Sequence, residues 1–213
     1  MSKGDQHSMI HWNGDQMVVV DVETTGLDPH WHEIIQICIL PLDSNIKPRK
    51  DVMPFYIEMI PEYPERASPE AMTINKLDFA KIAQRGHDRE KAKDLLEEWM
   101  NRLGLPYTTY GNRKRVIPLG QNYAFDQAQI KSWLGEETYS EYFAHRYRDT
   151  LQTANYLNDR AGMHAEKVPF NKTTLSWLCN KLNIENLKAH DALADCMATA
   201  EVYRKLLMQG LLG

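Results

Sequence analysis

The stretch MVVVDVETTGLDP, residues 17–29, predicts a buried strand that ends in two carboxylates. Residues 17–20 form an apolar run rich in β-branched side chains, which is typical of a strand buried on both faces. Because side chains alternate along a strand, we expect Asp21 and Glu23 to point to the same side. The sequence therefore places two acidic groups side by side where this strand leaves the core.

Two carboxylates in such a place repel each other and lose hydration unless something neutralises them. A divalent cation does so directly, and Mg²⁺ or Mn²⁺ accepts carboxylate oxygens while keeping positions open for water and a substrate phosphate. Asp21 and Glu23 are therefore candidate metal ligands. The alternative is that both only cap the following turn, residues 24–26, because so short a motif has little specificity.

A third acid follows in LGQNYAFDQAQI, residues 119–130. The apolar residues 116–119 predict another strand, and residues 124–134 predict a helix, although their apolar positions fit helical spacing imperfectly. Asp126 then lies in the first helical turn, where the helix dipole and free N–H groups favour a negative charge. Acidic residues are common in first turns without any metal, so a purely structural role also fits.

A fourth acid and a histidine occur in AHDALADCMATA, residues 189–200. Residues 191–208 predict a long helix, and Asp195 lies beside its apolar stripe, at the margin between core and cleft. The predicted stripe consists of Leu193, Cys196, Met197, Ala200, Tyr203 and Leu207. On a continuous helix His190 would be about 140° away from Asp195, so both can face one site only if His190 precedes the helix. Asp191 as a helix N-cap is the alternative explanation of this segment.

The rest of the chain predicts an α/β order. Residues 17–22, 34–40 and 53–60 predict three strands, and the prolines at positions 61, 64 and 69 predict an irregular connection after them. Residues 92–103 predict a helix with one apolar face, which Gly104 ends. Further helices are expected near residues 124–134, 150–160, 173–181 and 191–208.

The three motifs, D-x-E-T-T-G-L, G-x-N-x-x-F-D and H-x-x-x-x-D, resemble those of the DEDDh 3′-to-5′ exonucleases in order and separation. That group includes polymerase proofreading subunits, ribonuclease T and oligoribonuclease. The resemblance covers about residues 17–207, nearly the whole chain. It implies an α/β, ribonuclease H-like fold, in which a mixed β-sheet is flanked by α-helices and the carboxylates converge on one edge.

The resemblance assigns two divalent metal ions, Mg²⁺ or Mn²⁺, to four acids: Asp21, Glu23, Asp126 and Asp195. It makes His190 the general base that takes a proton from the attacking water, a task that suits an imidazole with a pKa of about 6.5. The implied activity is hydrolysis of single-stranded nucleic acid from the 3′ end to nucleoside 5′-monophosphates. We expect DNA to be modestly favoured over RNA, although the resemblance itself does not distinguish the two.

The resemblance also predicts a substrate pocket, because the S-x-E-A-x-x-x-N pattern of residues 68–75 is similar to the stretch that lines the terminal-nucleotide pocket in the family. The backbone of residues 24–27 would receive the terminal sugar, and Leu27 would wedge near the last base. The predicted substrate-binding residues are Thr24, Thr25, Gly26, Leu27, Ile74, Asn75, Asn122 and Phe125. Turn packing of Leu27, core packing of Phe125 and turn capping by Asn122 are the alternatives.

Three other functions stay open. An exoribonuclease of the ribonuclease T or oligoribonuclease type would carry the same motifs, because none of them reads the 2′-hydroxyl. A non-catalytic nucleic-acid or polymerase-binding module would not need all five site residues. A phosphatase of the haloacid-dehalogenase type needs D-x-D, so Glu23 counts against it.

Length and charge fit one exonuclease domain over residues 1–213, with the motifs in a core at about 17–208 and a polar segment at 1–13. The formal net charge of -4 argues against the wrapping of long duplex DNA, which needs an extended basic surface. Single-stranded 3′ ends of DNA or RNA remain suitable partners, because bound metals offset the acids locally. The short basic clusters at 113–115 and 145–148 are interpreted as solvated surface, and the alternative is that they supply contacts to phosphate, with Tyr147 stacking on a base.

The cysteines and the N-terminal segment predict an intracellular protein. Cys38, Cys179 and Cys196 are scattered and form no C-x-x-C pair, so we expect reduced core thiols. No signal-peptide region or membrane-spanning run is present in the sequence, which predicts a cytoplasmic location, or a host's cytoplasm for a viral source. A polymerase, another replication or repair partner, or a homodimer would supply processivity.

Overall fold

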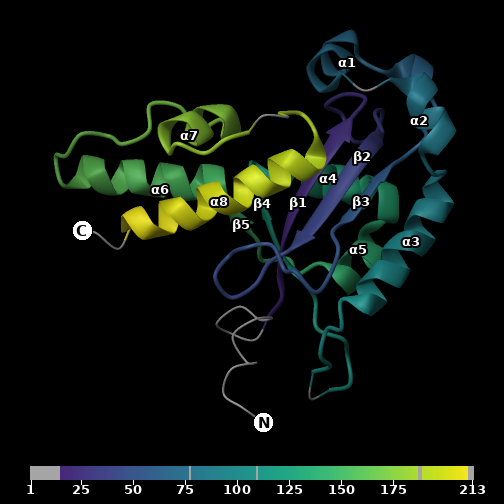
Figure 1. Ribbon diagram of the computed structural model, residues 1–213, viewed down its shortest axis with the longest axis horizontal. Helices are drawn as coiled ribbons and strands as arrows, with labels where there is room; N and C mark the ends of the chain where they lie inside the picture. The colour runs from purple at the N-terminus through teal and green to yellow at the C-terminus, as the bar shows by residue number, and fades with distance from the viewer. Residues whose placement is uncertain (1–14, 77, 109, 187–188, 211–213) are drawn as a thin grey trace.

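The computed structural model describes residues 15–76, 78–108, 110–186 and 189–210, and within these ranges the chain forms a five-stranded mixed sheet with strand order β3-β2-β1-β4-β5 (Figure 1). The strands are β1 (Met17–Thr24), β2 (Ile34–Pro41), β3 (Phe55–Glu58), β4 (Ile117–Gly120) and β5 (Arg148–Asp149). Strands β1, β2 and β3 pair antiparallel, whereas β4 pairs parallel with both β1 and β5. The predicted α/β class with a mixed sheet is confirmed.

Helices cover both faces of this sheet (Figure 1). One face packs against α3, α4 and α5, and the other packs against α8, which in turn contacts α6 and α7. The helical elements are the short 3₁₀ helix η1 (Pro64–Arg66), α1 (Pro69–Asn75), α2 (Phe79–Arg85), α3 (Arg89–Arg102), α4 (Tyr123–Leu134), α5 (Glu136–Tyr142), α6 (Thr150–Met163), α7 (Leu175–Lys181) and α8 (Ala192–Gly210).

The alternation along β1 decides which face receives the acids. Val18, Val20 and Val22 belong to the core that includes α3, α4 and α5, whereas Met17 and Val19 pack with α8. Asp21 and Glu23 continue the second series, because side chains two residues apart share a face. The predicted strand therefore directs both carboxylates toward the face that α8 covers.

Three helices lie where the sequence predicted none. Helix α1 begins at Pro69, and the Ser68 hydroxyl caps it by accepting a hydrogen bond from the Ala71 N–H at 3.2 Å. The prolines had predicted an irregular connection, but proline is favourable at the first helical position, where its missing N–H costs nothing. Helices α2 and α5 and the two-residue strand β5 are too short to show a clear hydrophobic period.

The predicted apolar stripe of the C-terminal helix is partly wrong. Met197 and Leu207 are exposed in α8. The helix instead buries two faces, one against the sheet and one against α6 and α7, because it lies between them. Cys196, Ala200 and Tyr203 form the first face, and Ala198, Val202 and Leu206 form the second.

The structure places the cysteines in the core and the basic clusters near the residue that precedes β1. Cys38, Cys179 and Cys196 are buried free thiols, which confirms that prediction. Both basic clusters contact the segment just before β1, since Lys114 and Arg146 pair with Asp15 at 3.5 and 2.6 Å. Among the described residues, no helix has the length and apolar character needed to cross a bilayer. The polar segment predicted at 1–13 lies outside the described residues.

Candidate active site

The first two acids are positioned by the central strand. Asp21 stands opposite Cys38 and Glu23 opposite Gln36 in the antiparallel pairing of β1 with β2, and the register shifts directly after Glu23. This irregularity ends the regular ladder where the polar turn begins. A slip by one residue would carry both carboxylates to the opposite face, so the apolar pattern of β1 also fixes the position of the acids.

Asp126 reaches the same strand from the first turn of α4. Its Oδ1 accepts a hydrogen bond from the Val22 N–H at 3.0 Å, between the two acids of β1, and the side chain is buried. The start of α4 is held by the buried carboxylate of Asp149, which accepts from the N–H groups of Asn122 and Tyr123 at 3.1 and 2.8 Å. The predicted first-turn position of Asp126 is confirmed.

Asn122 precedes α4 in a left-handed conformation with φ of 60°, and its side chain makes no capping hydrogen bond. The alternative role of Asn122 as a turn cap is therefore wrong. The side chain of Asp149 accepts these hydrogen bonds instead, and no motif in the sequence indicated this residue. Asn122 is exposed, and its contact with a substrate remains a prediction.

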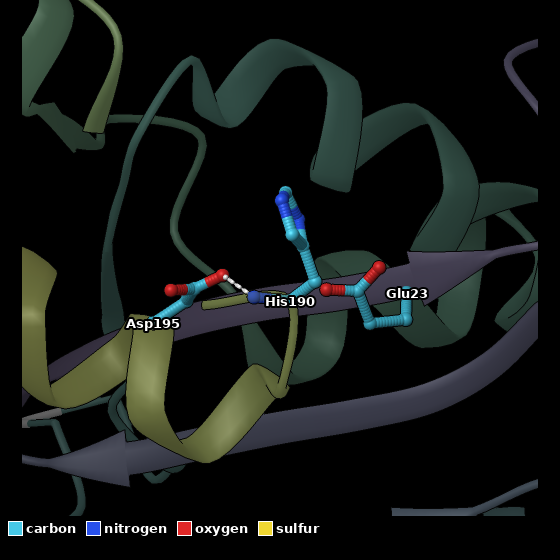
Figure 2. A group of neighbouring side chains, drawn as sticks. All are labelled: Glu23, His190 and Asp195. Carbon is cyan, nitrogen blue, oxygen red and sulfur yellow. Dashed lines mark hydrogen bonds between the residues drawn. The ribbon is translucent and has the colours of Figure 1, made fainter. Parts of the chain in front are cut away.

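Asp195 and His190 lie at the start of α8, and Figure 2 shows His190 between the carboxylates of Asp195 and Glu23. His190 precedes the helix, as predicted from the angle of about 140° that would separate it from Asp195 on a continuous helix. Its backbone is left-handed, with φ of 69°. Its backbone N–H donates to Asp195 Oδ2 at 3.0 Å. Asn186 donates its amide N–H to the other oxygen, Asp195 Oδ1, at 2.6 Å.

The beginning of α8 is tied to the sheet by side chains. The Ala192 N–H donates to Gln36 Oε1 at 2.8 Å, and the Tyr56 hydroxyl donates to Asp191 Oδ2 at 2.8 Å. Asp191 also accepts from the Ala194 N–H at 3.0 Å, so its predicted capping role is confirmed. These bonds connect β2 and β3 with the turn that carries the histidine.

The electrostatics of the site follow from burial and from the proximity of like charges. Burial raises the pKa of Asp21 well above its ordinary value, and repulsion from Asp126, Glu23 and Asp195 adds to the rise. Burial and then Asp195 raise the pKa of Glu23 to about 7. Burial also raises the pKa of Asp126, although its hydrogen bond from Val22 opposes the change. The protein thus holds acidic groups close together at a cost in stability.

These residues fit a divalent cation. One ligand atom each from Glu23, His190 and Asp195 lies within 4.8 Å of the others. Each carboxylate oxygen has two acceptor positions, so both oxygens of Asp195 keep one position beside their hydrogen bonds. A cation would also remove the repulsion that raises the pKa of Asp21. The donor set is rich in hard oxygen ligands, as Mg²⁺ and Mn²⁺ prefer.

A pocket of about 460 Å³ lies next to the acidic cluster. Glu23 belongs to the cluster and also lines the pocket. Its walls are mainly apolar, with Leu27, Ile74 and Phe125 as the large side chains. Leu27 is 80% exposed, which contradicts ordinary turn packing, whereas Phe125 lines the pocket and also packs against the core. The predicted substrate residues Thr24, Gly26 and Asn75 complete part of the wall, but Thr25 and Asn122 are not among its lining residues.

The side chains of Thr24, Thr25 and Asn75 hold the pocket together. Thr24 donates to Gly26 O at 2.7 Å, Thr25 accepts from the Glu33 N–H at 2.9 Å, and Asn75 donates to Thr24 O at 3.0 Å. A Cβ on Gly26 would overlap the His32 imidazole, at 2.3 Å from its nearest ring atom. The turn therefore needs glycine for close packing against a side chain.

The structure adds residues that sequence reasoning missed: Gln36, Tyr56, Asp149 and Asn186. Their contacts cross long distances in the chain, so no local motif marks them. Asn186 differs, because it stands four residues before His190 and beside the third motif. In the described part of the chain its Oδ1 is buried without a hydrogen-bond partner, which makes it an unusual neighbour for a carboxylate.

Known proteins match this chain over nearly its full length. The exonuclease family model matches residues 18–203. The chain belongs to the exonuclease family. The resemblance drawn from the motifs is thereby confirmed, and the predicted class, a hydrolytic exonuclease, is confirmed at the level of this family.

Similar members of the exonuclease family include ribonuclease T of Wigglesworthia glossinidia brevipalpis, which is 27% identical over 200 residues, or 92% of this chain and 86% of that protein. The structure of cell-death related nuclease 4 has a TM-score of 0.68 and 17% identity over 92% of this chain. A zinc-bound complex of E. coli exonuclease I with single-stranded DNA has a TM-score of 0.70 and 17% identity, also over 92% of this chain. The chain spans 64% of the former and 41% of the latter, and both confirm the ribonuclease H-like fold.

Proposed function

We propose that this protein is a metal-dependent 3′-to-5′ exonuclease that hydrolyses single-stranded nucleic acid to nucleoside 5′-monophosphates. The observation that carries the proposal is the convergence of acids from β1, α4 and α8 with one histidine, directly beside an apolar pocket. The divalent ions that the acids would hold suit the phosphate, and the apolar pocket suits a base. Residues 1–213 would act as one exonuclease domain.

The acids would hold two divalent ions, Mg²⁺ or Mn²⁺, with Asp21, Glu23, Asp126 and Asp195 as ligands. The chemistry supplied by the bound ions is neutralisation of charge at the phosphate and activation of water. His190 would take the proton from the attacking water through its exposed imidazole, while its backbone N–H stays bonded to Asp195. The turn before α8 therefore separates two tasks, orientation by the backbone and proton transfer by the ring.

The pocket would accept the terminal nucleotide. Leu27, Ile74 and Phe125 supply apolar surface for the base, and Leu27 is exposed enough to lie between the last two bases. The N–H groups of Gly26 and Leu27 have no acceptor among the residues that the structure describes, so we assign them to the terminal sugar hydroxyl. Asn75 and Thr24 would act through the backbone that they hold in place.

We take single-stranded DNA as the first substrate to test and RNA as the second. The single-stranded DNA bound to exonuclease I supports the first, and the name of the ribonuclease T relative supports an exoribonuclease. A polymerase or other replication or repair partner, a homodimer and a cytoplasmic location remain predictions from the sequence.

The test is a pair of 5′-labelled single strands, one DNA and one RNA, incubated with Mg²⁺ or Mn²⁺. We expect a ladder that shortens from the 3′ end and is absent with EDTA or with Asp21→Ala. Asp94→Ala is the matched control, because Asp94 is an exposed acid on α3, and it should behave as wild type. Cleavage that survives both EDTA and Asp21→Ala would exclude the metal mechanism, and no cleavage of either strand would indicate a binding module.

A further inference from the structure

An exposed aromatic cluster lies outside the pocket and is not used by the proposed chemistry. The Arg66 guanidinium lies 4.4 Å from the ring centroid of Trp31 and 3.8 Å from that of Tyr63. Trp31 is 52% exposed and Tyr63 is 43% exposed. We call these three residues, Trp31, Arg66 and Tyr63, the outer stack.

The outer stack is held firmly although its rings reach solvent. The buried carboxylate of Glu33 accepts from the Glu62 and Tyr63 N–H groups at 3.0 and 2.9 Å, and it pairs with Arg89 at 3.2 Å. On the other side, the Trp31 N–H donates to Asp28 O at 3.1 Å within a tight turn. Large rings on a fixed backbone give up little entropy when they bind a flat partner.

Both segments of the outer stack lead directly into the pocket. Trp31 stands four residues after Leu27, and Arg66 stands two residues before Ser68, and both Leu27 and Ser68 line the pocket. The two segments are joined there, because the Ser68 N–H donates to Thr25 O at 2.7 Å. The outer stack is therefore continuous with the proposed site for the terminal nucleotide.

We propose that the outer stack binds a base of the substrate strand upstream of the last two nucleotides. Aromatic rings and arginine planes bind bases by stacking, independently of sequence. Asp28, Glu62 and Glu65 are exposed neighbours of these residues in the sequence and offset the charge of Arg66, so stacking on the rings, and not pairing with phosphate, would carry the contact. The inference rests on the proposed function and extends it, since it adds a second contact for strands longer than the pocket can hold.

The first test is the dependence of cleavage on strand length, from dinucleotide to octanucleotide. Trp31→Ala should raise the KM for the octanucleotide about tenfold, while kcat and the cleavage of the dinucleotide stay unchanged. Trp31→Phe should keep most of the affinity. Tyr110→Ala removes a ring that is 91% exposed on the loop before β4, and it should leave every length unaffected.

The second test uses 2-aminopurine, a base whose fluorescence falls when it is stacked, at successive positions from the 3′ end, with Ca²⁺ in place of Mg²⁺. One upstream position should be quenched by wild type and by Trp31→Phe but not by Trp31→Ala. Equal KM values for wild type and Trp31→Ala at all lengths would overturn the outer stack while the exonuclease proposal stands. Binding with this quenching but without cleavage would support the outer stack and reject the exonuclease, and absence of binding would reject both.

Discussion

The two halves of the acidic site are held in different ways. Asp21 and Glu23 belong to the central strand, and Asp126 is bound to a backbone N–H of that strand. Asp195 and His190 lie at the start of α8, which is tied to the sheet near them by Gln36 and Tyr56. The first half is fixed by the backbone ladder, whereas in the second half α8 is fixed by packing and the turn that carries His190 is held by a few hydrogen bonds.

This difference indicates where the site can adjust. The strand cannot shift without loss of its register, but the turn before α8 can move if a few side chains exchange partners. His190 already occupies a left-handed conformation, which is uncommon for residues other than glycine. We therefore expect changes in the strand half to affect chemistry and stability together, and changes in the α8 half to affect chemistry alone.

The strongest test of the strand half is Asp21→Asn. Activity should fall by about 10³-fold or more, because the loss of a proposed metal ligand would remove several kcal/mol of transition-state stabilisation. Burial and repulsion make the ionised Asp21 unfavourable, so the substitution should stabilise the metal-free protein at neutral pH. A gain of about 1 kcal/mol in the free energy of unfolding corresponds to a rise in Tm of about 2–4 °C for a chain of this size. Hydrolysis assays and thermal melts in EDTA measure both effects.

Asp94→Asn is the control for this test and should change neither quantity. A metal-free Asp21→Asn protein that melts below wild type would show that Asp21 stabilises the strand half. The proposal that repulsion among buried acids destabilises the strand half would then be wrong.

In the α8 half, His190→Ala should reduce kcat by about 10²–10⁴-fold, the usual contribution of a general base. Metal affinity and Tm should stay close to wild type, because the Asp195 contact uses the backbone N–H of residue 190. Isothermal titration with Mn²⁺ separates the roles. A large loss of Mn²⁺ affinity would make the imidazole a ligand instead of the base.

Asn186→Ala should weaken metal binding about tenfold, which is typical when a residue that orients a ligand is removed. The variant loses the hydrogen bond to Asp195 Oδ1 but keeps all proposed ligands. Asn180→Ala, at an exposed position on α7, is the matched control. Unchanged Mn²⁺ affinity in both variants would show that the backbone alone orients Asp195, and that the α8 half is as well fixed as the strand half.

The smallest effect concerns the pH dependence of stability in EDTA. The pKa of Glu23 rises from its usual 4.5 to about 7, so between these values the folded state binds more protons than the unfolded state. The free energy of unfolding should therefore fall as pH rises through this interval, with Asp21 and Asp126 acting in the same direction. Urea titrations should show a weaker fall with Glu23→Gln or with added Mg²⁺. Stability that rises with pH over the interval would contradict the proposed repulsion.

The sequence predicted all of the long elements, but only some of the short ones. The apolar run of β1 and the one-sided stripe of α3 are strong periodic signals, and both elements were found. Helices α1, α2 and α5 are each seven residues long, which is too short for a clear period, although α7 has the same length and lies within the helix predicted at 173–181. The error on α8 has another cause, because a helix packed on two sides has no single stripe.

For the site, the motifs located the acids but not the bonds that orient them. Alternation along β1 was enough to place Asp21 and Glu23 on one face, and the helical angle was enough to place His190 before α8. The contacts of Tyr56 with Asp191 and of Gln36 with Ala192 join residues more than a hundred positions apart. Only the folded chain brings such pairs together, so local patterns cannot reveal them.

The order of these residues along the chain also fixes when the site can exist. A chain whose synthesis has reached only Leu134 already contains Asp21, Glu23 and Asp126, but it has neither Asp195 nor His190. Because α8 brings the last two, the full set of acids cannot assemble until that segment has left the ribosome. The set of acids therefore stays incomplete throughout the synthesis of residues 1–194.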